Sequence, residues 1–174
     1  LRVRLLSHGR KFGQADVQNA TLAGGVAIGS CANMIVQPWG ALVVGLAGGA
    51  VSTFGFRVLQ DKIEANFGVH DTAGVQNLHG WPALLAAIVS MIVGVAARES
   101  DGYDEPKEYS AIFPRGGAQG RYQLYATLLT LLIASTSGVL CAWVVKRCVP
   151  RNYGQGYDDG SFWEMDIDMR QKGV

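Results

Sequence analysis

Charged residues are scarce in this chain of 174 residues, because Asp, Glu, Lys and Arg make up 17% of it, whereas soluble domains average about 25%. The 15 basic and 14 acidic residues nearly cancel, so there is no basic excess of the kind that binds nucleic acid. The hydrophobic share of 49% is also far above that of a disordered chain. The composition therefore excludes a nucleic-acid-binding protein and favours a packed, apolar one.

Cysteine pairs and catalytic motifs are lacking as well. The three cysteines, Cys31, Cys141 and Cys148, lie in or beside apolar stretches and predict no disulfide framework. We find no nucleophile–base set, no metal-ligand spacing and no phosphate-binding loop. The sequence therefore predicts no enzyme activity, no metal site and no cofactor.

The charges that are present leave three long gaps, between Asp16 and Arg57, between Asp71 and Arg98, and between Arg121 and Lys146. A bilayer-spanning helix needs about 20 residues, so each gap is long enough for at least one span. The first gap has room for two, divided by the turn formers at 37–40 (QPWG). We predict an all-α, polytopic membrane protein with four transmembrane helices at about 18–36, 39–57, 72–97 and 122–145. A soluble protein with buried helices is the alternative, but its helices would carry charge on a solvent-facing side.

Four spans place both ends of the chain on one side of the membrane. That side carries 11 of the Lys and Arg residues, whereas the connection at 98–121 carries 4. The positive-inside rule then places both ends in the cytoplasm and this connection outside, as a solvated loop. We predict a membrane domain over 1–147 and a cytoplasmic tail over 148–174.

Glycine is abundant, with 23 residues in the chain. Gly25 and Gly29 in the first predicted span, and Gly45 and Gly49 in the second, have the four-residue spacing that lets membrane helices approach closely. We predict helix-packing roles for these four glycines, with tight packing as the simplest interpretation.

His79 lies inside the third predicted span. At about 1.5 Å per residue it lies some 12 Å beyond Asp71, near the bilayer midplane, where an ionisable residue indicates function. On a helical wheel it joins Thr72 and Gln76 in a polar stripe that we expect to face the protein interior or a cavity. The alternative is a neutral structural histidine bonded to a neighbouring helix. Asp71 is predicted to cap this helix or, alternatively, to line a pore mouth.

Three stretches, taken in order, resemble the Rh glycoproteins of the ammonium transporter (Amt/Mep/Rh) family. They are 16–25 (DVQNATLAGG), 71–80 (DTAGVQNLHG, in which DTAG and NLHG carry the likeness) and 162–165 (FWEM). The resemblance covers nearly the whole chain. Ala73 and Trp81 depart from it, and Trp81 is a large ring that could narrow a pore or pack outward.

The resemblance implies a trimer of pores in the plasma membrane, either a homotrimer or an Rh heterotrimer. Each subunit would have an 11- or 12-helix fold of two inverted repeats, and this chain would supply four helices of the second repeat and the tail. His79 would match the second of two pore histidines, Val75 a pore-lining position and Asp71 the aspartate that starts that helix. The tail would contact other subunits or bind an adaptor, for example a cytoskeletal one.

The transported species implied by the resemblance is ammonium or ammonia. Because an apolar pore cannot compensate the desolvation of a bare cation, ammonia would cross after losing a proton to the pore mouth. His79 would hydrogen-bond the passing molecule or relay its proton. A non-transporting structural Rh-type protein and a channel for carbon dioxide or another neutral gas are the alternatives.

Overall fold

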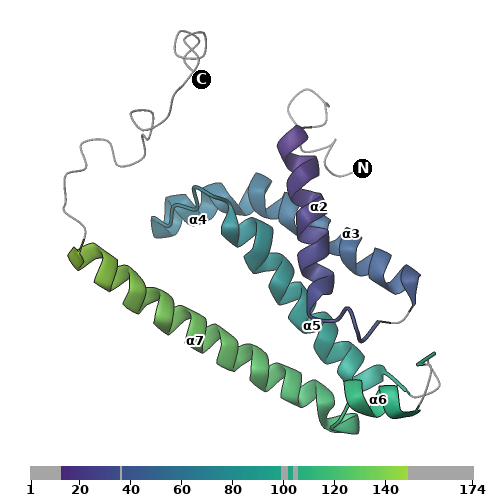
Figure 1. Ribbon diagram of the computed structural model, residues 1–174. Coiled ribbons are helices and arrows are strands. Elements are labelled where there is room, and N and C mark those ends of the chain that lie inside the picture. Colours follow the sequence, from purple (N-terminus) through teal and green to yellow (C-terminus); the bar gives the residue numbers. More distant parts are fainter. Residues whose placement is uncertain (1–12, 36, 99–101, 104–105, 149–174) are drawn as a thin grey trace. The chain divides into compact units, whose positions relative to one another are not determined.

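The computed structural model describes residues 13–35, 37–98, 102–103 and 106–148, which form helices and turns (Figure 1). This part of the chain contains no β-strand. The chain divides into two compact units, Leu1–Leu131 and Leu132–Val174. Of the second unit, only residues 132–148, the last part of one helix, are described, so the predicted tail at 148–174 lies outside the described residues apart from Cys148.

The first two helices are joined by a turn in which proline sets the start of the second. Helix α2 covers Gln14–Gly29, and α3 covers Pro38–Phe54. Proline suits the first turn of a helix because its missing N–H would have no intrahelical partner there. Helix α3 continues through the π-helical turn η2 (Gly55–Leu59) into α4 (Gln60–Phe67), giving a helical stretch of 30 residues. It ends at Gly68, whose φ of 63° is a left-handed conformation suited to glycine.

The second half of the described chain has the same pattern of long apolar helices. A π-helical turn, η3 (Gln76–Gly80), leads directly into α5 (Trp81–Ala96), and together they form a helix of 21 residues. After α6 (Pro106–Ile112) and the short 3-10 turn η5 (Gly116–Ala118), α7 runs over Gln119–Cys148.

Three stretches are long and apolar enough to cross a membrane: Pro38–Phe67, Gln76–Ala96 and Lys107–Cys148. The span predicted at 18–36 differs, because α2 has 16 residues and ends at Gly29. At about 1.5 Å per residue such a helix is roughly 24 Å long, less than the 30 Å apolar core of a bilayer. The chain turns after Gly29, where Cys31 N–H donates to the Ile28 carbonyl, on its way to the start of α3. Whether α2 crosses the bilayer stays a prediction.

Helices α2, α3 and α5 contact one another, and α2 lies across α3 (Figure 1). The crossing is made by small residues, since Ala23 and Ala27 of α2 are fully buried and Gly48 and Gly49 of α3 lie against that helix. A Cβ at Gly48 would lie 2.9 Å from the Ala23 carbonyl oxygen, and one at Gly49 would lie 2.9 Å from the Ala20 carbonyl oxygen. The two backbones are therefore as close as glycine allows.

The glycines predicted to pack helices take different places in this crossing. Gly49 lies within the crossing. Gly45 lies against Gly24 of α2, because a Cβ added at Gly24 would meet the Gly45 carbonyl oxygen at 3.0 Å. A Cβ at Gly25 or Gly29 would meet no described atom within 4 Å. A packing role for those two glycines stays a prediction.

The described residues between α5 and α7 include an aromatic cluster. Tyr103, Tyr109 and Phe113 pack edge to face or tilted, with ring centroids 5.0–5.6 Å apart, and Phe113 is buried. The Tyr103 hydroxyl donates to the Met34 carbonyl at 2.8 Å, and the Tyr109 hydroxyl donates to the Ala97 carbonyl at 2.9 Å. These aromatic residues therefore cover the hydrophobic core next to the C-terminal end of α5.

Candidate functional site

The two π-helical turns meet at one buried contact. Gly55 of η2 is buried, and Asn77 of η3 is 1% exposed. A Cβ at Gly55 would clash with Asn77 Oδ1 and would lie 3.1 Å from Asn77 Cγ. π-Turns are rare and occur often at functional sites, so their meeting marks this region as the candidate site.

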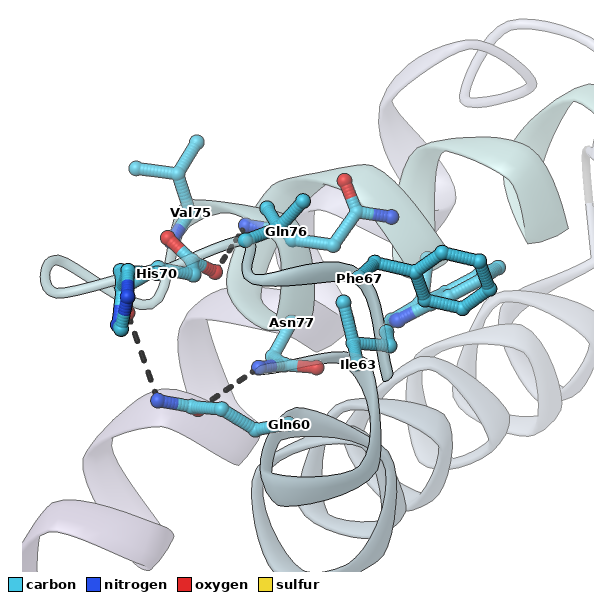
Figure 2. Close-up of a pocket in the computed structure, with 10 residues that line it drawn as sticks. Gln60, Ile63, Phe67, His70, Val75, Gln76 and Asn77 are labelled. Atoms are coloured by element: carbon cyan, nitrogen blue, oxygen red, sulfur yellow. Dashed lines mark hydrogen bonds between the residues drawn. The ribbon is translucent and has the colours of Figure 1, made fainter. Parts of the chain in front are cut away.

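A directed chain of hydrogen bonds joins the two helical stretches (Figure 2). Gln60 Nε2 donates to the Asp71 carbonyl oxygen at 3.4 Å, and Asn77 Nδ2 donates to Gln60 Oε1 at 2.9 Å. A backbone carbonyl only accepts, so the orientation of the Gln60 amide is fixed, and that in turn fixes the Asn77 amide. Asn77 Oδ1 is consequently left without a hydrogen-bond partner among the described residues.

Asp71 lies at the start of the turn that leads into the helix carrying His79. Its Oδ1 accepts the Val75 backbone N–H at 2.9 Å, and its Oδ2 accepts the Gln76 backbone N–H at 2.8 Å. Both carboxylate oxygens thus bind backbone amides that have no intrahelical partner, which is the geometry of a helix cap. Negative charge at this end also complements the helix dipole.

An open pocket of ≈ 610 Å³ lies between α4 and the start of the η3–α5 helix (Figure 2). Its wall is mostly apolar with a few amide and ionisable groups, contributed by Gln60, Ile63, Phe67, Val69, His70, Asp71, Val75, Gln76, Asn77 and Trp81. Such a combination is typical of small-molecule sites. His70 Nδ1 lies 2.8 Å from Glu64 Oε1, so the imidazole on the pocket wall is paired with a carboxylate of α4.

The residues predicted from the sequence take different places relative to this pocket. Val75 and Asp71 line the pocket, and so does Trp81, whose indole N–H has no partner among the described residues. His79 is exposed and does not line this pocket. Gln76, which the sequence placed only in a polar stripe, does line it.

Gln60, Asn77 and Gly55 are site residues that the sequence reasoning missed. The sequence signal for Gln60 was weak, because it lies after Arg57, beyond the charge-free gap used to define a span. Asn77 is part of the stretch that carries the family resemblance, yet nothing in its type or spacing shows that it is buried against Gly55. That contact depends on the two helices coming together.

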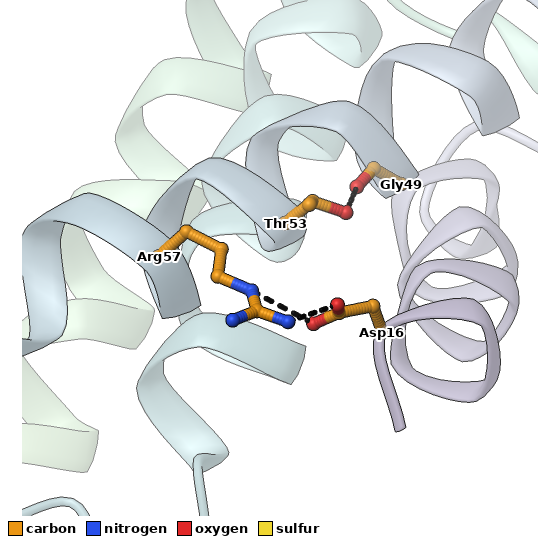
Figure 3. Close-up of polar contacts among 4 residues, drawn as sticks. All are labelled: Asp16, Gly49, Thr53 and Arg57. Carbon is orange, nitrogen blue, oxygen red and sulfur yellow. Dashed lines mark hydrogen bonds and ion pairs between the residues drawn. The ribbon is translucent and has the colours of Figure 1, made fainter. Parts of the chain in front are cut away.

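An ion pair holds the start of α2 to η2 (Figure 3). Arg57 Nε donates to Asp16 Oδ1 at 3.2 Å, and a second bond joins Arg57 Nη2 to Asp16 Oδ2. One turn earlier in α3, Thr53 Oγ1 donates to the Gly49 carbonyl at 2.8 Å. A two-point contact between guanidinium and carboxylate fixes relative orientation as well as distance. Asp16 and Arg57 therefore brace the helical stretch that supplies Gln60 to the pocket.

Among the described residues there is no group of three His, Cys, Asp or Glu side chains placed to hold a metal ion. The pocket's polar groups are instead suited to hydrogen bonding a small polar molecule between apolar walls.

The fold and the pocket define a helical, multi-pass membrane protein with a mostly apolar pocket that carries a few polar groups at a helix start. Residues 2–157 match the Ammonium Transporter Family, and this chain belongs to that family. It is 39% identical over 167 residues to the ammonium transporter Rh type C of Oryctolagus cuniculus, covering 89% of this chain and 34% of the relative. It is 35% identical over 171 residues to the ammonium transporter Rh type B of Sus scrofa, covering 92% of this chain and 36% of the relative.

A solved structure shares the fold. It is described as "Nitrosomonas europaea Rh50 and mechanism of conduction by Rhesus protein family of channels", and it matches with a TM-score of 0.70 and 33% identity. The match covers 99% of this chain and 39% of the solved one. The chain thus spans little more than a third of the length of these relatives.

Proposed function

We propose that this chain forms part of the wall of a channel that carries ammonium nitrogen across a membrane, with ammonia as the species that crosses the apolar section. The observation that carries the proposal is the pocket with apolar walls and a few amide and carboxylate groups at the start of the η3–α5 helix. The names of its Rh type B and type C relatives support the substrate. The plasma membrane, cytoplasmic ends and a homotrimer or Rh heterotrimer belong to the same proposal.

The chemistry follows from desolvation. An ammonium ion loses several kcal/mol of hydration on entering an apolar passage that offers no charged partner, whereas ammonia is a small neutral dipole. A polar mouth followed by apolar helix faces favours release of a proton before entry. His79, on an exposed face of η3, is proposed to line the conduit together with a histidine elsewhere in the protein.

Flux through the purified full-length protein in liposomes tests the function. We expect methylammonium and ammonia flux well above that of empty liposomes, and a smaller effect on carbon dioxide. Equal flux with and without protein would contradict transport and favour a structural Rh-type role, whereas selective carbon dioxide flux would favour a gas channel. In the same assay, His79→Ala is expected to lower ammonia flux, and unchanged flux would remove His79 from the conduit while leaving the function in place.

Substitutions at Asp71 separate a capping role from a charge at the pore mouth. Asp71→Ala is expected to cost about 1–2 kcal/mol in free energy of unfolding, because two backbone amides lose their acceptors. Asp71→Asn keeps one acceptor oxygen but no charge, so under capping it should lose less stability and less flux than Asp71→Ala. Thermal unfolding and methylammonium flux of the full-length variants measure both. Equal flux loss in the two variants without loss of stability would contradict the capping role.

A further inference from the structure

We propose that Gln76 is the polar side chain that contacts the permeating molecule at this pocket, so that the contact is made by a group that cannot take up a proton. The inference rests on the proposed function and adds to it the residue and the kind of hydrogen bonding.

Gln76 is held at its backbone, and its side chain lies over a glycine. Its backbone N–H is bound by Asp71 Oδ2 at 2.8 Å. Its amide lies along the helix over Gly80, where an added Cβ would meet Gln76 Oε1 at 2.7 Å and Cδ at 2.8 Å. The absence of a side chain at Gly80 therefore leaves the space that the Gln76 amide occupies.

The Gln76 amide has its hydrogen-bonding capacity free. The side chain is exposed and lines the pocket, and among the described residues it has no hydrogen-bond partner. Figure 2 shows the Gln76 amide reaching away from Gln60 and Asn77, whose amides bond to each other. Three amide side chains thus line one pocket, and the free one is Gln76.

The π-turn explains why Gln76 lines the pocket and His79 does not. In η3 the Trp81 backbone N–H donates to the Gln76 carbonyl, a step of five residues in place of the usual four. The turn is wider than 3.6 residues, so the helical wheel that grouped Gln76 with His79 does not apply here. Gln76 instead comes into register with Trp81, and both line the pocket.

The hydrogen-bonding groups of an amide suit a neutral permeating molecule such as ammonia. A glutamine offers two N–H donors and one carbonyl acceptor, whereas ammonia both donates and accepts, so the two groups pair in either direction. An ammonium ion has no lone pair and can use only the carbonyl. Because an amide does not ionise near neutral pH, the contact itself does not change with pH. The ionisable groups around it are Asp71 and His70 on the pocket wall, Glu64 beside His70, and His79 on η3.

The first test is Gln76→Leu in the full-length protein in liposomes, which keeps the bulk and removes the hydrogen bonds. Methylammonium flux per folded protein is expected to fall by about tenfold or more, the scale of a lost hydrogen-bond partner in an apolar site. Gln18→Leu is the matched control, because Gln18 is an exposed glutamine on α2 away from the pocket, and it should conduct as the unsubstituted protein does. Unchanged flux in Gln76→Leu would overturn the inference.

The second test is Gln76→His, which supplies a donor and an acceptor but also ionises near pH 6.5, roughly the ordinary imidazole value. The flux of this variant is divided by that of the unsubstituted protein at each pH, which cancels the pH dependence of the substrate and of the other ionisable groups. The ratio is expected to fall several-fold as pH drops through this range, because an imidazolium repels ammonium and accepts no hydrogen bond. A ratio independent of pH would overturn the inference. Conduction by the unsubstituted protein in both tests keeps this failure distinct from failure of the proposed function.

Discussion

Gly48→Val is expected to separate α2 from α3 and to destabilise the protein by at least about 3 kcal/mol. This value is the upper end of the usual cost of overpacking a core. The new Cβ would clash with Ala27 Cβ and lie 2.9 Å from the Ala23 carbonyl oxygen. The carbonyl belongs to a helix backbone and cannot swing aside, so the whole of α2 must move. The measurement is thermal unfolding of the purified full-length protein in detergent, with methylammonium flux as a second readout.

Gly25→Val is the control for this prediction. It changes a glycine of α2 to the same residue, but a Cβ there would meet no described atom within 4 Å. With no clash, only the helix-propensity difference remains, which is expected to stabilise the protein by a few tenths of a kcal/mol because valine is the better helix former. If Gly25→Val destabilised the protein as much as Gly48→Val, the close approach of α2 and α3 would not be where the structure places it.

The glycine spacing predicts close helix packing, and in the structure Gly45 and Gly49 lie where α3 meets α2. A four-residue repeat identifies one face of each helix, and both Gly45 and Gly49 are on the face of α3 that meets α2. The spacing of Gly25 and Gly29 is just as regular, yet their face meets nothing described. Which face is covered depends on how the helices cross, and one helix's sequence does not contain that information.

The charge-free gaps located the helices better than their ends. The second predicted span ends at Arg57, whereas the helical stretch continues to Phe67. Arg57 is paired with Asp16, and the later charges lie on exposed positions of α4. A charge ends an apolar run without ending a helix. Likewise, α2 includes Asp16, which lies before the predicted span at 18–36.

The predicted polar stripe depends on regular helix geometry. The wheel that joined Thr72, Gln76 and His79 assumed 3.6 residues per turn, whereas the chain is π-helical from Gln76 to Gly80. A single wide turn shifts the faces, and composition gives little warning of it. The glycines that accompany it, Gly55 opposite η3 and Gly80 within it, were the available signal, because both leave room for an amide side chain.

Gly55→Ala is expected to destabilise the protein by about 1–3 kcal/mol, although alanine is the better helix former by about 1 kcal/mol. The added methyl group would clash with Asn77 Oδ1 and lie 3.1 Å from Asn77 Cγ. Asn77 cannot turn away without breaking its bond to Gln60, and a buried amide left unpaired costs about 1–3 kcal/mol. Because Asn77 is adjacent to Gln76 in η3, methylammonium flux is expected to fall together with the free energy of unfolding.

A double-substitution cycle shows whether the Gly55→Ala effect is made through Asn77. Asn77→Ser shortens the side chain and removes the clashing atoms, so in that background Gly55→Ala should cost less, with a coupling energy of about 0.5–3 kcal/mol. Chemical or thermal unfolding of the four full-length proteins gives the cycle. The same cost of Gly55→Ala in both backgrounds would contradict a contact between the two π-turns. A smaller cost in the Asn77→Ser background would show that the contact couples the helix bearing Gln60 to the helix bearing Gln76, because Asn77 is the residue that touches both Gly55 and Gln60.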